Sequence, residues 1–313
     1  MDRLPLNRGV ARLRLRMQQV TVRVPASTSN LGPGFDCLGV ALRLYNDVMV
    51  ACGSLRQQPH PTIVSQAAER FFKQARRRAF SFSFSIAEAI PRSRGLGSSA
   101  TIRLGILHAL NRLSGDPLDR LTLFQLCAEL EGHPDNAAPT NFGGFTVVVE
   151  SSGRADSRLL SGQRGVPNIQ RFEVSAHLYF VLLVPELEIR TSIARKILPS
   201  KISRVAAVEN CANACAITAA FASKNYEALR GAFADQLHQP FRAKLIPFLS
   251  LVMAAAEKRG ALGAFLSGSG SAICAVTLQN PDRVAAAMKR AAGSISSRTI
   301  ITRADNRGAQ VSN

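Results

Sequence analysis

The stretch PRSRGLGSSATIRLGIL, Pro91–Leu107, joins a glycine-rich turn and two serines to a segment with helical character. Gly95 and Gly97 can adopt backbone conformations that other residues rarely use, and they let the chain approach a ligand closely. The free N–H groups and the dipole at the start of the helix favour an anion, and Ser98 or Ser99 could cap that helix. The lysine of the phosphate-binding motif GxxxxGK[ST] is missing, so a triphosphate would need positive charge from elsewhere. Glycine–serine turns before helices are common, so this stretch alone is a weak signal.

A second glycine-containing loop lies in PASTSNLGPGFDCLGVAL, residues 25–42, where Asn30 and Asp36 stand on either side of a Gly-Pro-Gly turn. An amide and a carboxylate on such a loop could recognise an amine and a hydroxyl. The alternative is an ordinary Asx-turn, which is very common.

A third polar group lies in AELEGHPDNAAPTNFGG, residues 128–144, directly after a predicted helix end. His133, Asp135 and Asn136 fall within four residues. A lone histidine would more often be structural, but three buried polar groups must each find partners. The cluster therefore favours the wall of a site.

The elements that must position these loops follow from the hydrophobic pattern. Strands are predicted at residues 19–26, 45–52, 80–87, 143–150, 176–186, 298–304 and on both sides of the glycine turn in 263–276. Helices are predicted at residues 65–78, 98–113, 121–131, just after 191, and at 205–223, 226–237, 246–258 and 281–292. Strands that flank helices and pair in hairpins indicate an α+β fold, and the polar residues 151–166 form the best candidate linker.

Composition narrows the class of protein. The chain has 313 residues, of which 46% are apolar and 19% charged, as in a globular protein of one or two domains. No apolar run approaches the ~20 residues that span a bilayer, so no membrane partner is expected. The net charge of +18 has no nucleic-acid motif or aromatic-rich strand beside it, so we expect no nucleic-acid partner. The basic residues 1–19 read as an upstream extension, with a targeting presequence as the alternative.

The six cysteines form no CxxC pair and have no histidine at zinc spacing, so free thiols in a reducing compartment are expected. Cys211 and Cys215 are four residues apart and would share one helix face, where small apolar packing is the expected role.

Together the three polar stretches resemble the N-terminal signatures of the homoserine kinases, a branch of the GHMP kinases. The segment GAFLSGSGSAICAV, residues 263–276, resembles the C-terminal glycine motif of the same family. The resemblance covers residues 20–304 in the right order. It is the combination of NLGPGFD with EGHPDN that points to homoserine kinases within the superfamily.

The resemblance implies an N-terminal α+β domain with a left-handed βαβ unit at residues 20–165, and a ferredoxin-like C-terminal domain at 166–313. It also implies phosphorylation of the side-chain hydroxyl of L-homoserine by ATP with Mg²⁺, in the cytoplasm, by a protein that often forms homodimers. Another GHMP kinase of mevalonate or shikimate type is the nearest alternative, and a non-catalytic basic binding protein on the same fold is a third.

Residue by residue, the family assigns roles to positions of this chain. The ATP phosphates would lie on Pro91, Arg92, Ser93, Arg94, Gly95, Leu96, Gly97, Ser98 and Ser99, and Mg²⁺ on Ser99 and Glu131, with Glu129 as the fallback. The substrate would contact Asn30, Asp36, His133, Asn136, Arg195 and Arg242, with the two arginines on its carboxylate. The catalytic positions would be Glu131, Asp135 and Asn136, with Asp135 orienting the loop and Asn136 contacting the hydroxyl.

The chain departs from the family pattern in its first nineteen residues, which have no counterpart, and in two of the motifs. Arg92, Arg94 and Arg103 stand where smaller or apolar residues are frequent, and the glycine motif reads GSGSA where GSGPT is usual. The phosphate-binding loop itself is intact.

Overall fold

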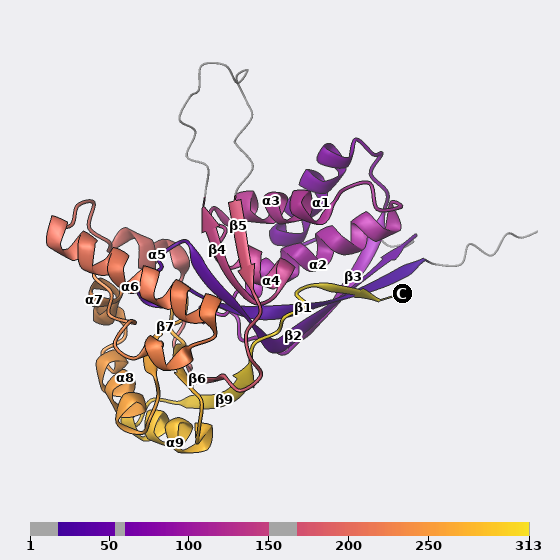
Figure 1. Ribbon diagram of the computed structural model, residues 1–313. Helices are drawn as coiled ribbons and strands as arrows, with labels where there is room; N and C mark the ends of the chain where they lie inside the picture. The colour runs from indigo at the N-terminus through magenta and orange to yellow at the C-terminus, as the bar shows by residue number, and fades with distance from the viewer. Residues whose placement is uncertain (1–17, 54–59, 150–167, 313) are drawn as a thin grey trace, which may run out of the picture.

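The computed structural model describes residues 18–53, 60–149 and 168–312 as two antiparallel sheets with helices packed on them (Figure 1). The predicted extension at 1–19 lies almost entirely outside the described residues. The predicted linker at 151–166 and the domain boundary at 165/166 also lie outside them. All strand pairs among the described residues are antiparallel.

The first sheet has the strand order β10-β1-β2-β4-β5, and β3 also pairs with β2. Its strands are β1 Gln19–Ser29, β2 Leu38–Cys52, β3 Phe82–Glu88, β4 Phe145–Val149, β5 Asn168–Phe172 and β10 Gln310–Ser312. Four helices pack on it: α1 Thr62–Ala75, α2 Ser98–Leu113, α3 Arg120–Glu131 and α4 Ala137–Phe142 (Figure 1). Two strands from the second half of the chain, β5 and β10, therefore complete a sheet that the first half begins.

The predicted patterning of this half is confirmed. Along β3 the serines are exposed, while Phe82 is buried and Phe84 is half-buried. Phe71 and Phe72 of α1 are buried against the sheet. Helix α2 has the bounds that its sequence predicts, and its long buried face makes it the central helix of the layer.

The second sheet has the order β7-β8-β6-β9, with strands β6 Tyr179–Pro185, β7 Gly263–Leu266, β8 Ile273–Thr277 and β9 Ser297–Arg303. Helices α8 Leu249–Lys258 and α9 Pro281–Ala291 connect these strands and pack on each other beside the sheet (Figure 1). This order is that of a ferredoxin-like fold, as predicted. Between β6 and α8 the chain adds α5 Thr191–Lys196, α6 Arg204–Ser223, α7 Gln239–Arg242 and two short 3₁₀ turns, Tyr226–Leu229 and Ala243–Leu245.

The predicted helix over 226–237 is wrong, because only one 3₁₀ turn forms there. The Asp235 carboxylate accepts hydrogen bonds from the N–H groups of Leu237, His238 and Gln239. These amides therefore find a side-chain partner instead of the carbonyls of a continuing helix. The prediction that Cys211 and Cys215 pack as small apolar residues is also wrong, because both are exposed on α6. The prediction of free thiols is confirmed for all six cysteines.

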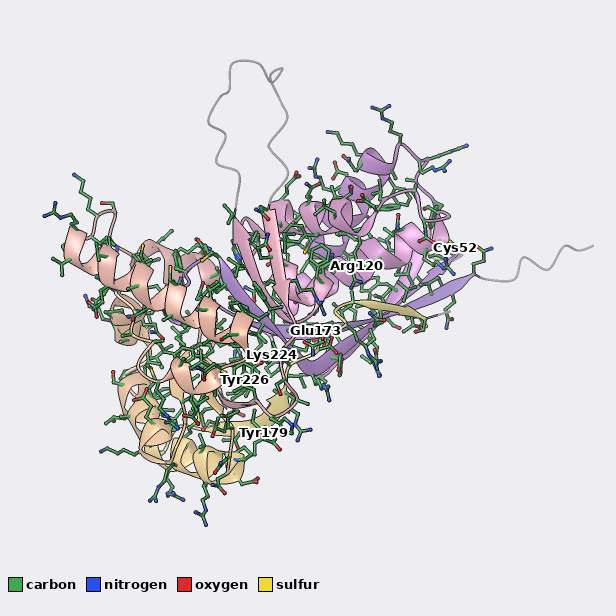
Figure 2. All side chains as sticks on the ribbon, viewed as in Figure 1. Cys52, Arg120, Glu173, Tyr179, Lys224 and Tyr226 are labelled. Carbon is green, nitrogen blue, oxygen red and sulfur yellow. The ribbon has the colours of Figure 1, made fainter. Side chains whose placement is uncertain are left out.

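The two halves share packed side chains and hydrogen bonds. Phe145 of β4 stacks on Phe221 of α6 with ring centroids 4.3 Å apart. Within the second half, the hydroxyl of Tyr226, labelled in Figure 2, accepts a hydrogen bond from the backbone N–H of Ser175 at 2.9 Å and so ties the 3₁₀ turn after α6 to the segment after β5. Arg120, also labelled, donates to backbone carbonyls of Arg307 and Ala309 and so ties the C-terminal segment to α3. A cavity between the halves thus has firmly joined walls.

His108 provides a test of the core by pH. It is buried in α2, its Nε2 pairs with Oδ1 of Asn141 at 2.7 Å, and burial lowers its pKa to about 4. Between pH 6.5 and 4, His108 is therefore protonated in the unfolded chain but not in the folded chain. As pH falls through this range, the free energy of unfolding decreases by up to about 1.4 kcal/mol per pH unit. We expect His108→Gln to have a shallower loss of unfolding free energy between pH 6.5 and 4.5, measured by urea denaturation. Equal slopes in both proteins would contradict the neutral buried histidine.

Candidate active site

One cavity of about 490 Å³ gathers the predicted site residues from both halves. Its walls come from the β1–β2 loop, the loop before α2, the segment after α3, the start of α5, α7 and the turn between β7 and β8. Every predicted site residue lines it except Pro91, which lies in the phosphate loop but not on the cavity wall. Residues far apart in sequence thus meet at one place, as in the hydrogen bond from Nδ2 of Asn30 to the carbonyl of Gly268, 238 positions away.

The loop before α2 is shaped by its glycines. Gly95 and Gly97 have φ values of 72° and 69°, which favour glycine. The expected serine cap is wrong: Gly97 is the N-cap, and no described side chain caps the helix. Ser98 is already helical, and Ser99 directs its hydroxyl to Glu131 instead. The N–H groups of the first turn are therefore left for an anion.

The glycine turn of the second sheet clasps this loop. Ser267 donates its hydroxyl to the carbonyl of Gly95 at 2.7 Å, and the N–H of Ala272 donates to the carbonyl of Arg94 at 3.1 Å. From the first sheet, the N–H of Ser27 donates to the carbonyl of Leu96 at 3.2 Å. Three successive carbonyls are thereby held away from the cavity, which turns the amides of the loop toward it.

Glu131 and Ser99, the two residues predicted to hold Mg²⁺, lie in direct contact. The Ser99 hydroxyl donates to Oε2 of Glu131 at 2.7 Å, and Arg103 contacts Oε1. Among the described residues no group of three or more His, Cys, Asp or Glu side chains is arranged to hold a metal ion by itself. Mg²⁺ does not need one, because it commonly takes one or two protein oxygens and completes its shell with water and phosphate. These two adjacent hard-oxygen donors fit that ion.

His133 and Asp135 form a hydrogen-bonded pair in the cavity wall. Nδ1 of His133 lies 2.6 Å from Oδ1 of Asp135, which also accepts the backbone N–H of Asn136. Burial alone would lower the pKa of His133 and raise that of Asp135, but their mutual hydrogen bond and charge outweigh it. The net result is a raised pKa for His133 and a lowered one for Asp135, so the carboxylate is a weak proton acceptor.

The Asn136 amide is already engaged on both sides. Its Oδ1 accepts the hydroxyl of Ser27 at 2.9 Å, and its Nδ2 donates to Oγ of Ser29 at 3.0 Å. These serines belong to β1, so the first strand orients the side chain that the family pattern assigns to the hydroxyl.

Two arginines surround the ring of Phe35 on the other side of the cavity. Arg195 pairs bidentately with Asp36 at 2.9 and 2.6 Å, and Arg242 lies with its guanidinium carbon 5.2 Å from the Phe35 centroid. Arg242 is only 1% exposed and donates to the carbonyls of Ala194 and Gly268 and to Nδ1 of His238.

Arg242 has the signature of a ligand-binding cation. None of the ion pairs among the described residues includes it. Burial and the nearby charge of Arg195 lower its pKa to about 10, although the carboxylates of Asp36, Asp235 and Asp135 act from a distance in the opposite direction. A buried charge without an ionic partner is costly, which marks a place where a bound anion would restore the balance.

The atypical Arg92 and Arg94 do not serve the phosphate loop as spare charge. Arg92 pairs with Glu88 of β3. Arg94 donates its Nε to the carbonyl of Pro185 at 2.7 Å and also reaches Glu188. Arg94 thus fastens the loop to the second half.

Sequence reasoning missed the apolar end of the cavity. That end is lined by Pro61, Ile63, Val64, Phe84, Ile86 and Ile102. The sequence pattern at this end is the alternation of Phe and Ser in β3, and that pattern predicts a buried strand face but not a ligand-binding surface. Sequence reasoning also missed Ser29, Arg190 and Thr191, since lone serines, threonines and surface arginines carry no pattern. Gly268 and Ser269 lie in the glycine motif that the sequence did single out, but no site role was predicted for them.

The comparisons with known proteins agree with this geometry. The family described as GHMP kinases N terminal domain matches residues 62–144, and the family described as GHMP kinases C terminal matches 217–294. A mevalonate kinase structure shares the fold, with a TM-score of 0.65 at 15% identity over 92% of this chain and 99% of that one. The fold and the glycine-clasped cavity define a kinase of the GHMP class.

Relatives sharpen the assignment. The homoserine kinase of Caldicellulosiruptor bescii is 35% identical over 93% of this chain and 96% of its own length, and that of Microchaete diplosiphon is 36% identical over 88% and 91%. A crystal structure of homoserine kinase from Cytophaga hutchinsonii has a TM-score of 0.81 at 25% identity, over 95% of this chain and 98% of that one. The chain belongs to the homoserine kinase family.

The clasp on the phosphate loop can be tested at Gly95. A Cβ there would lie 2.0 Å from the carbonyl oxygen of Ser267, whereas a Cβ at Gly115, which has a similar φ of 83°, would meet nothing within 4 Å. Both alanine variants carry the same backbone strain of about 1–2 kcal/mol. We expect Gly115→Ala to lose only that amount in denaturant unfolding and to bind ATP normally. Gly95→Ala should lose more stability and most of its ATP affinity in calorimetry; equal behaviour of the two would refute the clasp.

Proposed function

We propose that this chain transfers the γ-phosphoryl group of ATP to the side-chain hydroxyl of L-homoserine, giving O-phospho-L-homoserine for threonine biosynthesis in the cytoplasm. The observation that carries the proposal is Arg242, a buried guanidinium on the cavity wall with no ionic partner among the described residues. A carboxylate substrate would pair with this guanidinium directly, as no carboxylate of the described residues does.

The acceptor end of the cavity suits a zwitterion. Arg242 supplies a positive charge for the α-carboxylate, and Asp36 supplies a negative charge for the α-amine. In the structure Asp36 is neutralised by Arg195, with both side chains about one third exposed, so the pair is accessible and only moderately strong. An amino acid could share this pair, its carboxylate joining the arginines and its amine joining Asp36. Asn30 holds the Asp36 backbone through its Oδ1 at 3.0 Å.

The donor end suits a nucleotide. The phosphates would lie on the amides from Arg92 to Ser99, and the adenine ring on the apolar end beside Phe84 and Ile86. Mg²⁺, held by Ser99 and Glu131, would supply the positive charge that a lysine provides in other phosphate-binding loops.

The chemistry then needs positioning more than a strong base. Asp135 is engaged by His133 and its pKa is lowered, so it favours a structural role. Asn136, fixed by Ser27 and Ser29, is the side chain we assign to the acceptor hydroxyl.

Two alternative functions fit the cavity less well. A mevalonate- or shikimate-type acceptor would also satisfy Arg242, but it carries no amine for Asp36. A non-catalytic protein that uses its charge of +18 for nucleic acid would leave the buried Arg242 and the Ser99–Glu131 pair without a role.

We further propose a homodimer that buries the outer face of α6. By length and composition alone, this helix could cross a membrane. Its inner face, however, is packed in the fold, where Asn210, Ile217 and Phe221 are buried. On the outer face Val205 and Val208 are 77% and 64% exposed.

Acceptor choice tests the main proposal. ADP release is measured with L-homoserine, 4-hydroxybutyrate, mevalonate and shikimate. We expect L-homoserine to be preferred, because it alone combines the amine with the carboxylate. Asp36→Asn should raise the KM for L-homoserine by about 10–100-fold, the worth of one charge-assisted hydrogen bond, and should narrow its advantage over 4-hydroxybutyrate.

The matched control is Asp47→Asn, which breaks another bidentate pair, with Arg23, on the surface. It should leave the KM unchanged. A preference for mevalonate or shikimate, or equal effects of the two variants, would sink the proposal.

The dimer is tested by light scattering of Val208→Lys. A charge in the interface should shift the wild-type dimer to monomer at micromolar concentration. Leu251→Lys, at a 66% exposed leucine on α8, serves as the control and should stay dimeric. A monomeric wild-type protein would contradict the proposal outright.

A further inference from the structure

We infer that Arg103 is a positioning residue that neutralises Glu131 from behind and thereby reduces the dependence of nucleotide binding on Mg²⁺. This rests on the proposed nucleotide site, but not on the identity of the acceptor. Arg103 lies outside the cavity wall, whereas Glu131 and Ser99 line it. Arg103 would therefore act on a bound nucleotide without touching it, by offsetting the charge of Glu131.

The contacts form a two-point clamp on one carboxylate. Ser99 and Arg103 are four residues apart on α2 and so project from the same helix face. Ser99 donates to Oε2 of Glu131 and Arg103 to Oε1. The side chains of Arg103 and Glu131 are 13% and 7% exposed, so this pair is screened little by solvent.

Within the described part of the chain, Glu131 is the one side chain that pairs with Arg103. The Nε of Arg103 is buried without a hydrogen-bond partner among the described residues. Half-satisfied buried guanidinium groups are costly, which makes packing alone a poor reason for an arginine here. The ion pair with Glu131 is therefore the interaction that compensates for burying the Arg103 guanidinium.

The consequence is electrostatic. A lone Glu131 carboxylate would face the phosphates with a full negative charge and would repel a nucleotide that lacks its metal ion. With Arg103 attached, the local charge is close to zero. Because Oε2 is reached through the movable hydroxyl of Ser99, a metal ion could still approach that oxygen while Arg103 stays on Oε1. Arg103 thus weakens the repulsion of metal-free nucleotide and, by the same charge, weakens the attraction for Mg²⁺.

The test compares Arg103→Met with Arg103→Lys. ADP binding is measured by calorimetry with EDTA and again with excess Mg²⁺, and the Mg²⁺ concentration for half-maximal activity is measured separately. We expect Arg103→Met to weaken metal-free ADP binding by about tenfold or more and to reach half-maximal activity at several-fold lower Mg²⁺. Arg103→Lys, which keeps the charge, should remain within about threefold of wild type in both.

Two controls separate charge from stability. Arg70→Met breaks another arginine–glutamate pair to α3, with Glu129, on the exposed side, and should change neither measurement. The double variant Arg103→Met/Glu131→Gln restores a neutral site, so its metal-free ADP binding should return toward wild type while its response to Mg²⁺ is lost. This readout also covers the case in which Arg103→Met alone folds poorly.

Unchanged metal-free ADP binding in a folded Arg103→Met, or no recovery in the double variant, would overturn the inference. Failure of the proposed nucleotide site would look different, because then the wild-type protein would not bind ADP even with Mg²⁺.

Discussion

The site depends on one contact, the seating of the loop before α2 against the glycine turn of the second sheet. The hydroxyl of Ser267 donates a hydrogen bond to the carbonyl of Gly95, and the N–H of Ala272 donates one to the carbonyl of Arg94. A loop whose carbonyls are held from behind must present its amides forward, and amides at a helix start bind anions. Because the clasp comes from the second half of the chain, the phosphate site exists only when both halves fold together.

Charge in the cavity follows from how each arginine is engaged. Arg92 and Arg94 are occupied by Glu88 and by the carbonyl of Pro185, and Arg103 by Glu131. Arg242 is left buried without a carboxylate partner in the described part of the chain. Much of the basic composition is thus used in ion pairs and in hydrogen bonds that hold the cavity walls, whereas Arg190 and Arg242 line the cavity without an ion pair among the described residues.

The sequence predicted the local elements and the identity of the main loops well, because those depend on short-range pattern. Helix α2 and the alternation in β3 follow from residues that are neighbours in the chain. The helix predicted after Tyr226 does not form, which shows the limit of local pattern. The Asp235 side chain accepts hydrogen bonds from N–H groups that a continuing helix would pair with its own carbonyls. The pairing of Arg103 with Glu131, 28 residues away, and the clasp by Ser267 depend on tertiary contacts that carry no local signal.

The most direct measurement is a crystal structure with L-homoserine and a non-hydrolysable ATP analogue. The account predicts phosphates on the amides from Gly95 to Ser99, the α-carboxylate on Arg242, the α-amine on Asp36 and the side-chain hydroxyl facing Asn136. Phosphates bound away from that loop, or an amino acid whose carboxylate lies far from Arg242, would contradict it.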